Sequence, residues 1–353
     1  KELYDAQISN MPDSLKATNE LMNEFCDVLC DVENSGLQIS YENLSEIKTT
    51  YTKEVKDLER YLNTEVKSLM GDTPVNLDSP EDRSKIIFSR AVLNKKQWAS
   101  HFNLGYEVRG NTRKKKRLPT MSTQAFQQGI VRLTKPLFKT VMQRCSSCNG
   151  IGYKLALKRD GTVGKQKRIC KSCDKKGVIY RPTRDFAGLG MNSRGPIDLT
   201  VHGFKTDRPT LEGLVVTSRP EQKTFMESYI RYNAIKTYLK TFIEGIEKGL
   251  DDRSRIHPHY MQCVTSTGRL SSRNPNFQNM PRGGTFPVRK VVVSRWEGGH
   301  ILEGDYAQLE FRVAGFLAKD DKVYEDVRND VDVHSFTASV LGVSRQEAKA
   351  DTF

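Results

Sequence analysis

Apolar residues recur every three or four positions along the first part of the chain. One run extends from Leu21 to Val32 and a longer one from Leu44 to Leu69, and Gly36 and Gly71 follow them. This spacing predicts two amphipathic helices, each ended by a glycine. The second apolar stripe is long but narrow, which is typical of a projecting helix pair rather than of a helix enclosed in a core.

Further elements are predicted along the rest of the chain. Ser79, followed by Pro and two acids, has the composition of a helix start. Helical spacing returns over residues 225–250. The pattern then changes to strands over residues 288–294 and 300–306, which a glycine turn separates, and an amphipathic helix carrying Leu309 and Phe316 follows directly. The fold class predicted from this mixture is α+β.

Residues 105–203 are rich in Gly, Lys and Arg, and we interpret them as an insertion with a small metal-bound module at residues 141–181. Two CxxC pairs supply four thiols, those of Cys145, Cys148, Cys170 and Cys173. Two-residue gaps let both thiolates of a pair reach one ion, which predicts a structural Zn²⁺ in a zinc ribbon. Four Cys ligands leave no open position for a catalytic water. Chance cysteines or disulfides are the alternative.

The other three cysteines, Cys26, Cys30 and Cys263, lie among apolar residues and are predicted to be buried thiols.

Composition adds charge to this picture. Of 353 residues, 37% are hydrophobic and 28% charged, as in an ordinary folded protein, and the net charge is +13 with a pI near 9.3. The cations cluster at Arg113–Arg117 and Lys167–Lys176. A solvated surface is one reading, but clustering favours a polyanion, and nucleic acid is the expected partner. The DNA contacts expected in the first cluster are Arg113, Lys114, Lys115 and Lys116.

No apolar run is long enough to span a bilayer, and no signal-peptide pattern follows the first residue, Lys1. These features predict a cytoplasmic protein without a membrane partner, and a chain whose first residue is a cut in a longer protein.

The segment GDYAQLEFR holds the most informative charged residues. Asp305 ends a predicted strand and precedes a predicted helix, a position at which a rigid scaffold presents a carboxylate to a ligand. Helix capping is the structural alternative for this acid. Transfer of a nucleotide to a hydroxyl requires divalent metals held by carboxylates, which neutralise charge on the attacking and leaving oxygens.

Several segments together resemble the family A DNA polymerases, the group of bacterial DNA polymerase I and many bacteriophage replicases. Asp305–Arg312 resembles motif A, Thr267–Pro281 resembles the Thr-Gly-Arg segment, and Asp332–Ala338 resembles the family's DxHxxTA. RQEAK, ending at Lys349, resembles the start of the O helix of the fingers. Further matches are Arg255–Arg269, Val32–Ser40 and Val75–Pro80.

This resemblance implies a right-hand polymerase architecture with a helical thumb, an antiparallel-sheet palm and the beginning of helical fingers. The implied boundaries are 1–104 for the thumb, 105–203 for the zinc-ribbon insertion, 204–250 for a thumb-to-palm helical segment, 251–320 for the palm with motif A, and 321–353 for the start of the fingers.

It also implies roles for individual residues. Asp305, with the Tyr306 backbone carbonyl, is implied as a Mg²⁺ ligand in a two-metal site. Arg345 and Lys349, four residues apart on one helical face, resemble the pair that binds the triphosphate of a dNTP. His334 and Phe353 resemble further nucleotide contacts. The ordinary alternative is a solvated basic face for the Arg345–Lys349 pair and a packed side chain for His334.

Glu310 resembles the residue that crowds the sugar 2′ position, which implies DNA rather than RNA as the product and argues against a relative of the single-subunit RNA polymerases. Gln308 is implied near the substrate, where it and Arg312 would brace the site. The expected primer-template contacts are Arg269, Gln278 and Asn279, with backbone capping as the alternative.

The sequence departs from the family in one decisive respect: no second catalytic carboxylate follows motif A. This chain alone is therefore not expected to polymerise DNA, and the C-terminal remainder is expected on the same or a second polypeptide. The alternative is a DNA-binding, non-catalytic subunit. By analogy with phage thumb insertions, residues 105–203 would recruit a processivity factor, and the protein would act in the cytoplasm of an infected bacterium.

Overall fold

The computed structural model describes residues 2–109, 112–157, 163–281, 286–345 and 348, and it contains two compact units, residues 1–293 and 294–353. Each unit is described by itself.

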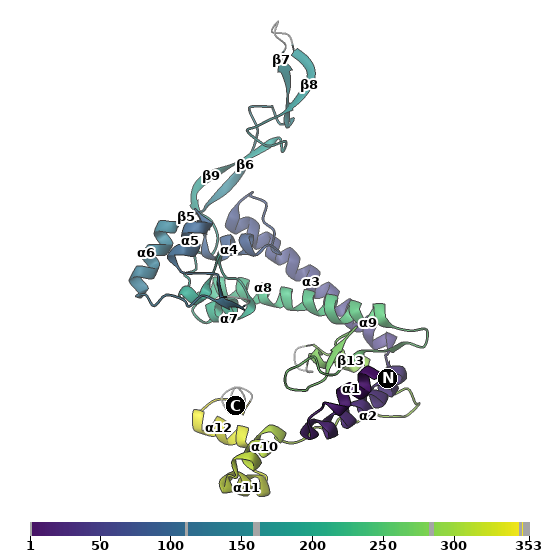
Figure 1. Cartoon of the computed structure of the whole chain (residues 1–353). Helices are drawn as coiled ribbons and strands as arrows, with labels where there is room; N and C mark the ends of the chain where they lie inside the picture. The colour runs from purple at the N-terminus through teal and green to yellow at the C-terminus, as the bar shows by residue number, and fades with distance from the viewer. Residues whose placement is uncertain (1, 110–111, 158–162, 282–285, 346–347, 349–353) are drawn as a thin grey trace. The chain divides into compact units, whose positions relative to one another are not determined.

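Two long helices form the frame of the first unit. α3 (Tyr41–Met70) packs along α8 (Pro220–Tyr238), and Figure 1 shows the two running side by side. The Ser40 hydroxyl accepts a hydrogen bond from the Asn43 amide at the start of α3, and Gly71 ends it in the left-handed region at φ 74°. α1 (Glu2–Ser9) and α2 (Asp13–Ser35) precede it. Both helices predicted from the first apolar runs are confirmed.

A first core lies where short helices gather against α8. These helices are α4 (Pro80–Phe88), α5 (Lys95–His101), α6 (Thr123–Leu133) and α7 (Arg208–Val216). Trp98 is fully buried here, and its indole N–H donates to the Thr200 carbonyl over 2.9 Å. Phe126 and Leu199 join the same cluster, so parts of the predicted insertion contribute to the body.

A second core joins the start of α3 to the end of α8. There α8 passes through a π-helical turn, Leu239–Ile243, into α9 (Glu244–Gly249), so the predicted helix over residues 225–250 is present with one irregular turn. Tyr238 stacks on Phe286, with ring centroids 4.3 Å apart. Tyr51 meets both rings edge-on.

All sheets among the described residues are antiparallel pairs of strands. Five of them are short: β1 (Leu37–Gln38) with β12 (Arg255–Ile256), β2 (Arg90–Val92) with β5 (Thr134–Pro136), β3 (Tyr106–Arg109) with β4 (Thr112–Lys115), β10 (Leu199–Thr200) with β11 (Gly203–Phe204), and β13 (His259–Met261) with β14 (Ser271–Arg273).

The two longer pairs form a projection that we call the arm, residues 138–186. β6 (Phe138–Arg144) pairs with β9 (Val178–Phe186), and β7 (Tyr153–Leu157) pairs with β8 (Val163–Ile169) beyond it. In Figure 1 the arm rises from the body next to β5 and ends in the β7–β8 hairpin.

The second unit holds α10 (Leu309–Ala318), α11 (Asp321–Arg328) and α12 (Val333–Leu341). α10 packs on α11 at Gly315, where an added Cβ would lie 2.2 Å from a Val323 methyl. The predicted helix after motif A is confirmed.

Both strands predicted after residue 287 are wrong. Val288–Val291 is a 3₁₀ turn, and only Val292 forms a bridge, with Ile39. Residues 300–306 have no strand partner among the described residues. The apolar runs are real, but a strand also needs a neighbour to accept its backbone hydrogen bonds, and the described residues provide none there.

The prediction of buried thiols at Cys26, Cys30 and Cys263 is also wrong, because all three are exposed. For Cys26 and Cys30 the reason is that α2 buries only Leu29 among its described residues, so most of its apolar face remains open to solvent. Cys263 lies in the loop between β13 and β14.

Candidate functional site

Motif A forms an exposed turn at the start of α10. Asp305 and Tyr306 are both exposed, Tyr306 to 80%, and they precede the helix directly. Gln308 takes the left-handed conformation at φ 52°, and its carbonyl accepts the Arg312 amide. The Asp305 carboxylate is therefore open to a ligand, four residues before the first residue of α10.

Two polar side chains hold this turn in place. The Gln308 amide donates to the Val331 carbonyl over 3.3 Å, which links the turn to the segment before α12. The Arg312 Nε–H donates to the Ala307 carbonyl over 2.8 Å, and its guanidinium lies 3.9 Å from the Asp330 carboxylate. These contacts are of the bracing kind expected for both residues.

Asp332 organises the other half of the second unit. Its carboxylate caps α12 by accepting the amides of His334 and Ser335. It also receives the Arg345 Nε–H over 2.6 Å. The pKa of Asp332 is held well below its usual range, first by Arg345 and then by Ser335, and the pKa of Arg345 is raised by the same contact. Arg345, expected to bind triphosphate, thus has a carboxylate partner in this structure.

Four further predicted nucleotide contacts fall in the second unit, two of them among its described residues. His334 is half-buried in the first turn of α12, and Glu310 is exposed in the first turn of α10. Lys349 and Phe353 lie outside the described residues.

The expected DNA contacts of the first unit lie on exposed turns. Arg269 is exposed in the loop between β13 and β14, and its carbonyl accepts the Thr265 hydroxyl. Gln278 and Asn279 are exposed on a 3₁₀ turn, Phe277–Asn279. The Asn279 backbone amide donates to the Asn276 side chain, so this cap does not use the Asn279 side chain.

Sequence reasoning missed Glu33 as the anchor of this hairpin. Its carboxylate accepts the Tyr260 amide and lies 3.4 Å from His259 Nδ1. Its carbonyl accepts the His257 Nδ1–H over 2.7 Å, while His257 Nε2 meets Asp251 at 3.3 Å. The alternating histidines of RIHPHY are the sequence feature that could have indicated these contacts of Glu33.

The four CxxC thiols form one compact cluster. All four sulfurs lie within 4.8 Å of one another, and the Cys145–Cys170 and Cys148–Cys173 Sγ distances are 3.8 and 3.6 Å. A tetrahedral ion with metal–sulfur bonds of about 2.3 Å places its ligands about 3.8 Å apart, whereas a disulfide requires about 2.05 Å. The thiols therefore fit a metal ion, and the disulfide alternative fails.

The charge state of the thiols supports the same conclusion. Burial raises the pKa of Cys170, but hydrogen bonds from the Ser172 amide and from the thiol and amide of Cys173 outweigh it and lower the value to about 6. Burial and the three neighbouring sulfurs raise the pKa of Cys173 to about 12. Four thiolates cannot share this space without a cation between them.

The basic run Arg113–Arg117 forms most of β4 and the two residues after it, and β4 pairs with β3. Arg113, Lys114 and Lys115 are exposed on β4, and the Arg113 guanidinium lies 4.4 Å from the centre of the Tyr106 ring. The side chains are free to meet a polyanion, as the sequence predicts for them.

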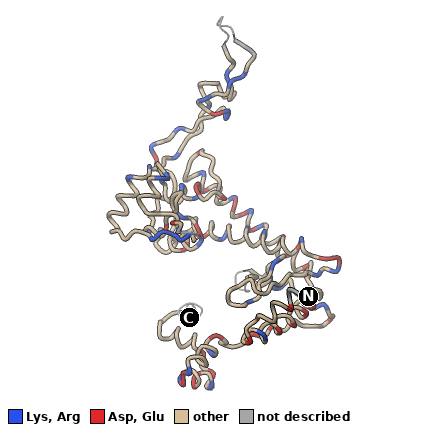
Figure 2. Tube along the Cα trace, in the orientation of Figure 1, with Lys and Arg blue, Asp and Glu red and all other residues tan. Residues whose placement is uncertain are grey.

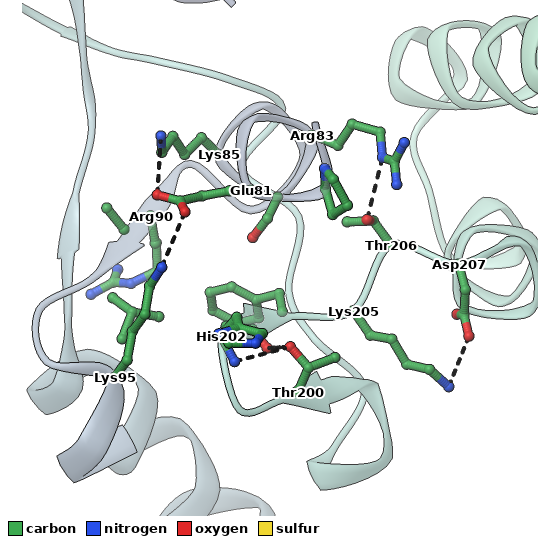
Figure 3. A pocket seen from close by; sticks show the side chains of 16 residues that line it. Glu81, Arg83, Lys85, Arg90, Lys95, Thr200, His202, Lys205, Thr206 and Asp207 are labelled. Atoms are coloured by element: carbon green, nitrogen blue, oxygen red, sulfur yellow. Dashed lines mark hydrogen bonds and ion pairs between the residues drawn. The ribbon is translucent and has the colours of Figure 1, made fainter. Parts of the chain in front are cut away.

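A cavity of about 380 Å³ opens between α4 and the β10–β11 hairpin (Figure 3). Three of its five cations are paired with acids: Lys95 and Lys85 lie 3.1 and 3.5 Å from Glu81, and Lys205 lies 3.0 Å from Asp207. Arg83 and Arg90 donate instead to the hydroxyls of Thr206 and Thr134. We assign the cavity no role.

Comparison with known proteins finds a family match for the C-terminal part of the chain. Residues 186–352 match the family described as DNA polymerase family A. The match covers a little less than half of the chain. The matched range contains the motif A turn, the β13–β14 hairpin and the Asp332 cap, while the arm lies before it, apart from Phe186.

Among relatives, DNA polymerase I of Caldicellulosiruptor bescii is 34% identical over 171 residues, 44% of this chain and 19% of that protein. DNA polymerase I of Pseudomonas aeruginosa is 34% identical over 194 residues, 50% of this chain and 21% of that protein. The matches thus span about a fifth of the length of these relatives.

One solved structure has the same fold: the POL domain of Pol1 from M. smegmatis in complex with DNA primer-template and dNTP. It covers 92% of this chain and 40% of its own, with a TM-score of 0.52 and 18% identity. The fold class is thereby that of a polymerase domain, with helices and small antiparallel sheets. No helix in the described part of the chain has the length and apolar character to cross a membrane.

Proposed function

We propose that this chain is the N-terminal part of the polymerase module of a template-directed DNA polymerase, which transfers a nucleotide from a dNTP to a primer 3′ end. The observation that carries the proposal is the Asp305 carboxylate, exposed at the start of α10 inside the family-matched range. The named regions, thumb, palm and start of the fingers, keep the boundaries predicted from the sequence.

Asp305 and the Tyr306 carbonyl would hold Mg²⁺, an ion that prefers oxygen ligands. Bound there, Mg²⁺ supplies charge neutralisation at the attacking and leaving oxygens. The residues of this chain do the positioning: Gln308 and Arg312 fix the turn that carries Asp305, so the carboxylate needs little reorganisation.

Arg345 would bind the triphosphate together with Lys349, with His334 and Phe353 as further nucleotide contacts. In this structure Arg345 is bonded to Asp332, so the triphosphate has to replace a carboxylate as its partner. Because the exchange is anion for anion, the Arg345 charge is never left unpaired, and Asp332 would hold the guanidinium in place between nucleotides. Glu310 would exclude ribonucleotides by occupying the space beside the sugar.

Arg269, Gln278 and Asn279 would contact the primer-template, and the β3–β4 hairpin with Arg113, Lys114, Lys115 and Lys116 would meet its phosphates. The support is their polar or charged character and the exposure of all of them except Lys116, which is half-buried.

The second metal carboxylate would come from outside these 353 residues, on the same or a second chain. Support comes from large apolar side chains on α10 and α12 that face solvent, since such faces are covered in folded assemblies. They include Phe316, Leu317, Phe336 and Val340, each at least 64% exposed. We further propose Zn²⁺ as the ion of the four thiols, with a structural role, and a bacteriophage source acting in the host cytoplasm.

A second candidate function is a non-catalytic subunit that binds DNA. The Arg345–Asp332 ion pair favours it, because this cation has a protein partner.

Primer extension by the chain together with its C-terminal remainder separates the two candidates. Asp305→Ala should lower the rate about 10³-fold, since a lost metal ligand removes several kcal/mol of transition-state stabilisation. Asp321→Ala, an exposed acid on α11, is the matched control and should leave the rate unchanged. Extension that survives Asp305→Ala would refute the assigned role, and DNA binding without any extension would favour the subunit.

A further inference from the structure

The arm carries most of the net positive charge of the chain. Residues 138–186 contain 13 Lys and Arg against three Asp and Glu, which is +10 of the total +13. Zn²⁺ with four thiolates would bear two negative charges, and the arm would then keep eight positive ones. Figure 2 shows this concentration along the projecting strands.

The cations of the arm differ from those of the body in their partners. On the long helices, Arg231 is bonded to Glu54 and Lys236 to Asp78, at 2.7 and 2.8 Å. Within the described part of the arm, no Lys or Arg side chain forms an ion pair. A counter-charge for these side chains must therefore come from another molecule or from dissolved ions.

The ladder even sets like charges against each other. Lys154 and Arg168 are directly opposite in the β7–β8 pair, and both are exposed. Like charges in this position destabilise a strand pair. An anion placed between them would relieve the repulsion, so a bound phosphate would stabilise the hairpin.

Exposed apolar side chains alternate with the cations on the same hairpin. Tyr153 is opposite Ile169, and Leu155 is opposite Lys167, so the second face of the ladder joins apolar groups to a cation. Ile151, before the hairpin, is 70% exposed. Cations interleaved with such groups suit a nucleic acid, which offers both phosphates and sugar or base surfaces.

The arm is also long and firmly attached. β6 has seven residues and β7 has five, so the two pairs extend about 23 and 17 Å at about 3.3 Å per residue, each about half a duplex turn or more. At the base, the Asp72 amide donates to the Thr140 carbonyl, and the Asp72 carboxylate accepts the Met142 amide, each over 2.8 Å. These bonds join β6 to the end of α3.

We propose that the arm is a second nucleic-acid-binding element, which binds the phosphodiester backbone independently of base sequence. The proposal goes beyond the function proposed above, because it requires neither Asp305 nor a nucleotide. Its ligand is a nucleic-acid strand, and the source, duplex or single strand, is resolved by the experiment.

The test compares two variants of the full chain with equal change in charge. The arm variant replaces Lys154, Lys167, Arg168 and Lys171 by Ala; the control replaces Lys96, Lys223, Lys240 and Lys248 by Ala, all exposed on helices of the body or in the π-helical turn. Binding to a 30-base-pair duplex and to a 30-nucleotide single strand is measured from 50 to 300 mM salt. Unchanged zinc content shows that the arm variant is folded.

The arm variant should bind at least about 10-fold more weakly at 50 mM salt, and the control much less so. For each phosphate that the arm variant no longer neutralises, the slope of log K against log salt should become shallower by about 0.9 on duplex and about 0.7 on single strand. Four phosphates would therefore change the slope by up to about 3.6 or 2.8. The probe whose binding weakens more is the preferred ligand.

Equal weakening in the arm variant and the control would overturn the proposal, because the effect would then be one of net charge. Full competition by polyglutamate at matched charge would also overturn it, in favour of an acidic protein partner such as a processivity factor. Loss of single-nucleotide addition in Asp305→Ala with arm binding intact would separate this proposal from the polymerase assignment.

Discussion

Removal of the metal should unfold the arm and leave the body folded. Among the described residues of the arm, the half-buried Ile179 is the one apolar side chain that packs against the four cysteines. Burying one such side chain completely contributes at most about 1.5–3 kcal/mol, while each ordered residue costs about 1 kcal/mol or more in backbone entropy. An isolated two-stranded hairpin is marginal in water, so the ion has to supply the remaining stability.

The magnitude follows from the four-sulfur geometry. Sulfur distances of 3.6 and 3.8 Å match the separation of about 3.8 Å in a tetrahedral zinc site, so the ligands need little rearrangement. Structural zinc sites of this type have apparent binding free energies of about 10–16 kcal/mol, which corresponds to a Kd between about 50 nM and 2 pM. One zinc per chain should therefore survive purification and resist weak chelators.

Hydrogen exchange resolved by peptide is the assay, with and without a strong chelator. Peptides from residues 138–157 and 163–186 should lose protection, while those from α3 and α8 keep it. Trp98 is a built-in control, because it is fully buried in the body and the arm contains no tryptophan. Its fluorescence should not change on chelation, although Trp296 is exposed and gives a constant background.

Cys170→Ser should reproduce the effect of the chelator, and Cys263→Ser, an exposed cysteine outside the cluster, should not. A chain that contains no zinc and still protects the arm would refute the reasoning. A change in Trp98 emission on chelation would refute the separation of arm and body.

Three further predictions concern the body. Gly71→Ala should destabilise the chain by at least about 1 kcal/mol in urea unfolding and deprotect the base of the arm in hydrogen exchange. The reason is that φ is +74° and the new Cβ would lie 2.2 Å from the Thr140 carbonyl oxygen. Gly245→Ala, where an added Cβ meets no atom within 4 Å, is the control. Trp98→Ala should cost about 3–5 kcal/mol of unfolding free energy, since the ring is fully buried; a decrease below about 1 kcal/mol would contradict this packing. The pKa of His257 is raised by the Glu33 carbonyl and then by Asp251, so its stabilising contribution is complete below about pH 6.5 and is lost as pH rises through the raised value. The unfolding midpoints of the parent and of His257→Gln should therefore converge between about pH 6 and pH 9. A constant gap between the two midpoints would count against this role of His257.

The helices of this fold were predictable because their signals are local. Ser40 and Ser79 cap α3 and α4 through their own hydroxyls, and Gly36 and Gly71 end α2 and α3. Such signals depend on neighbours three or four residues away, which the sequence displays directly.

The strands over residues 288–294 and 300–306 were not predictable in the same way. A strand depends on a partner from elsewhere in the chain, and apolar composition does not show whether one is present. The same limit explains why Phe126 and Leu199, assigned to an insertion by the composition around them, join the core of the body.

For the candidate site, residue types were predictable and partners were not. The spacing of the cysteines sufficed to place four sulfurs together. The spacing of Arg345 indicated a cation at the start of a helix, but its pairing with Asp332, 13 residues earlier, depends on how α12 folds back on the segment after it.

The central claim, that Asp305 holds a catalytic metal ion, is tested most directly by a structure of the full polymerase with primer-template, an unreactive dNTP analogue and Mg²⁺. The account predicts an Asp305 carboxylate oxygen about 2.0–2.1 Å from a Mg²⁺ ion that also contacts the nucleotide. A nucleotide bound with its Mg²⁺ while Asp305 ligates no ion would contradict the account.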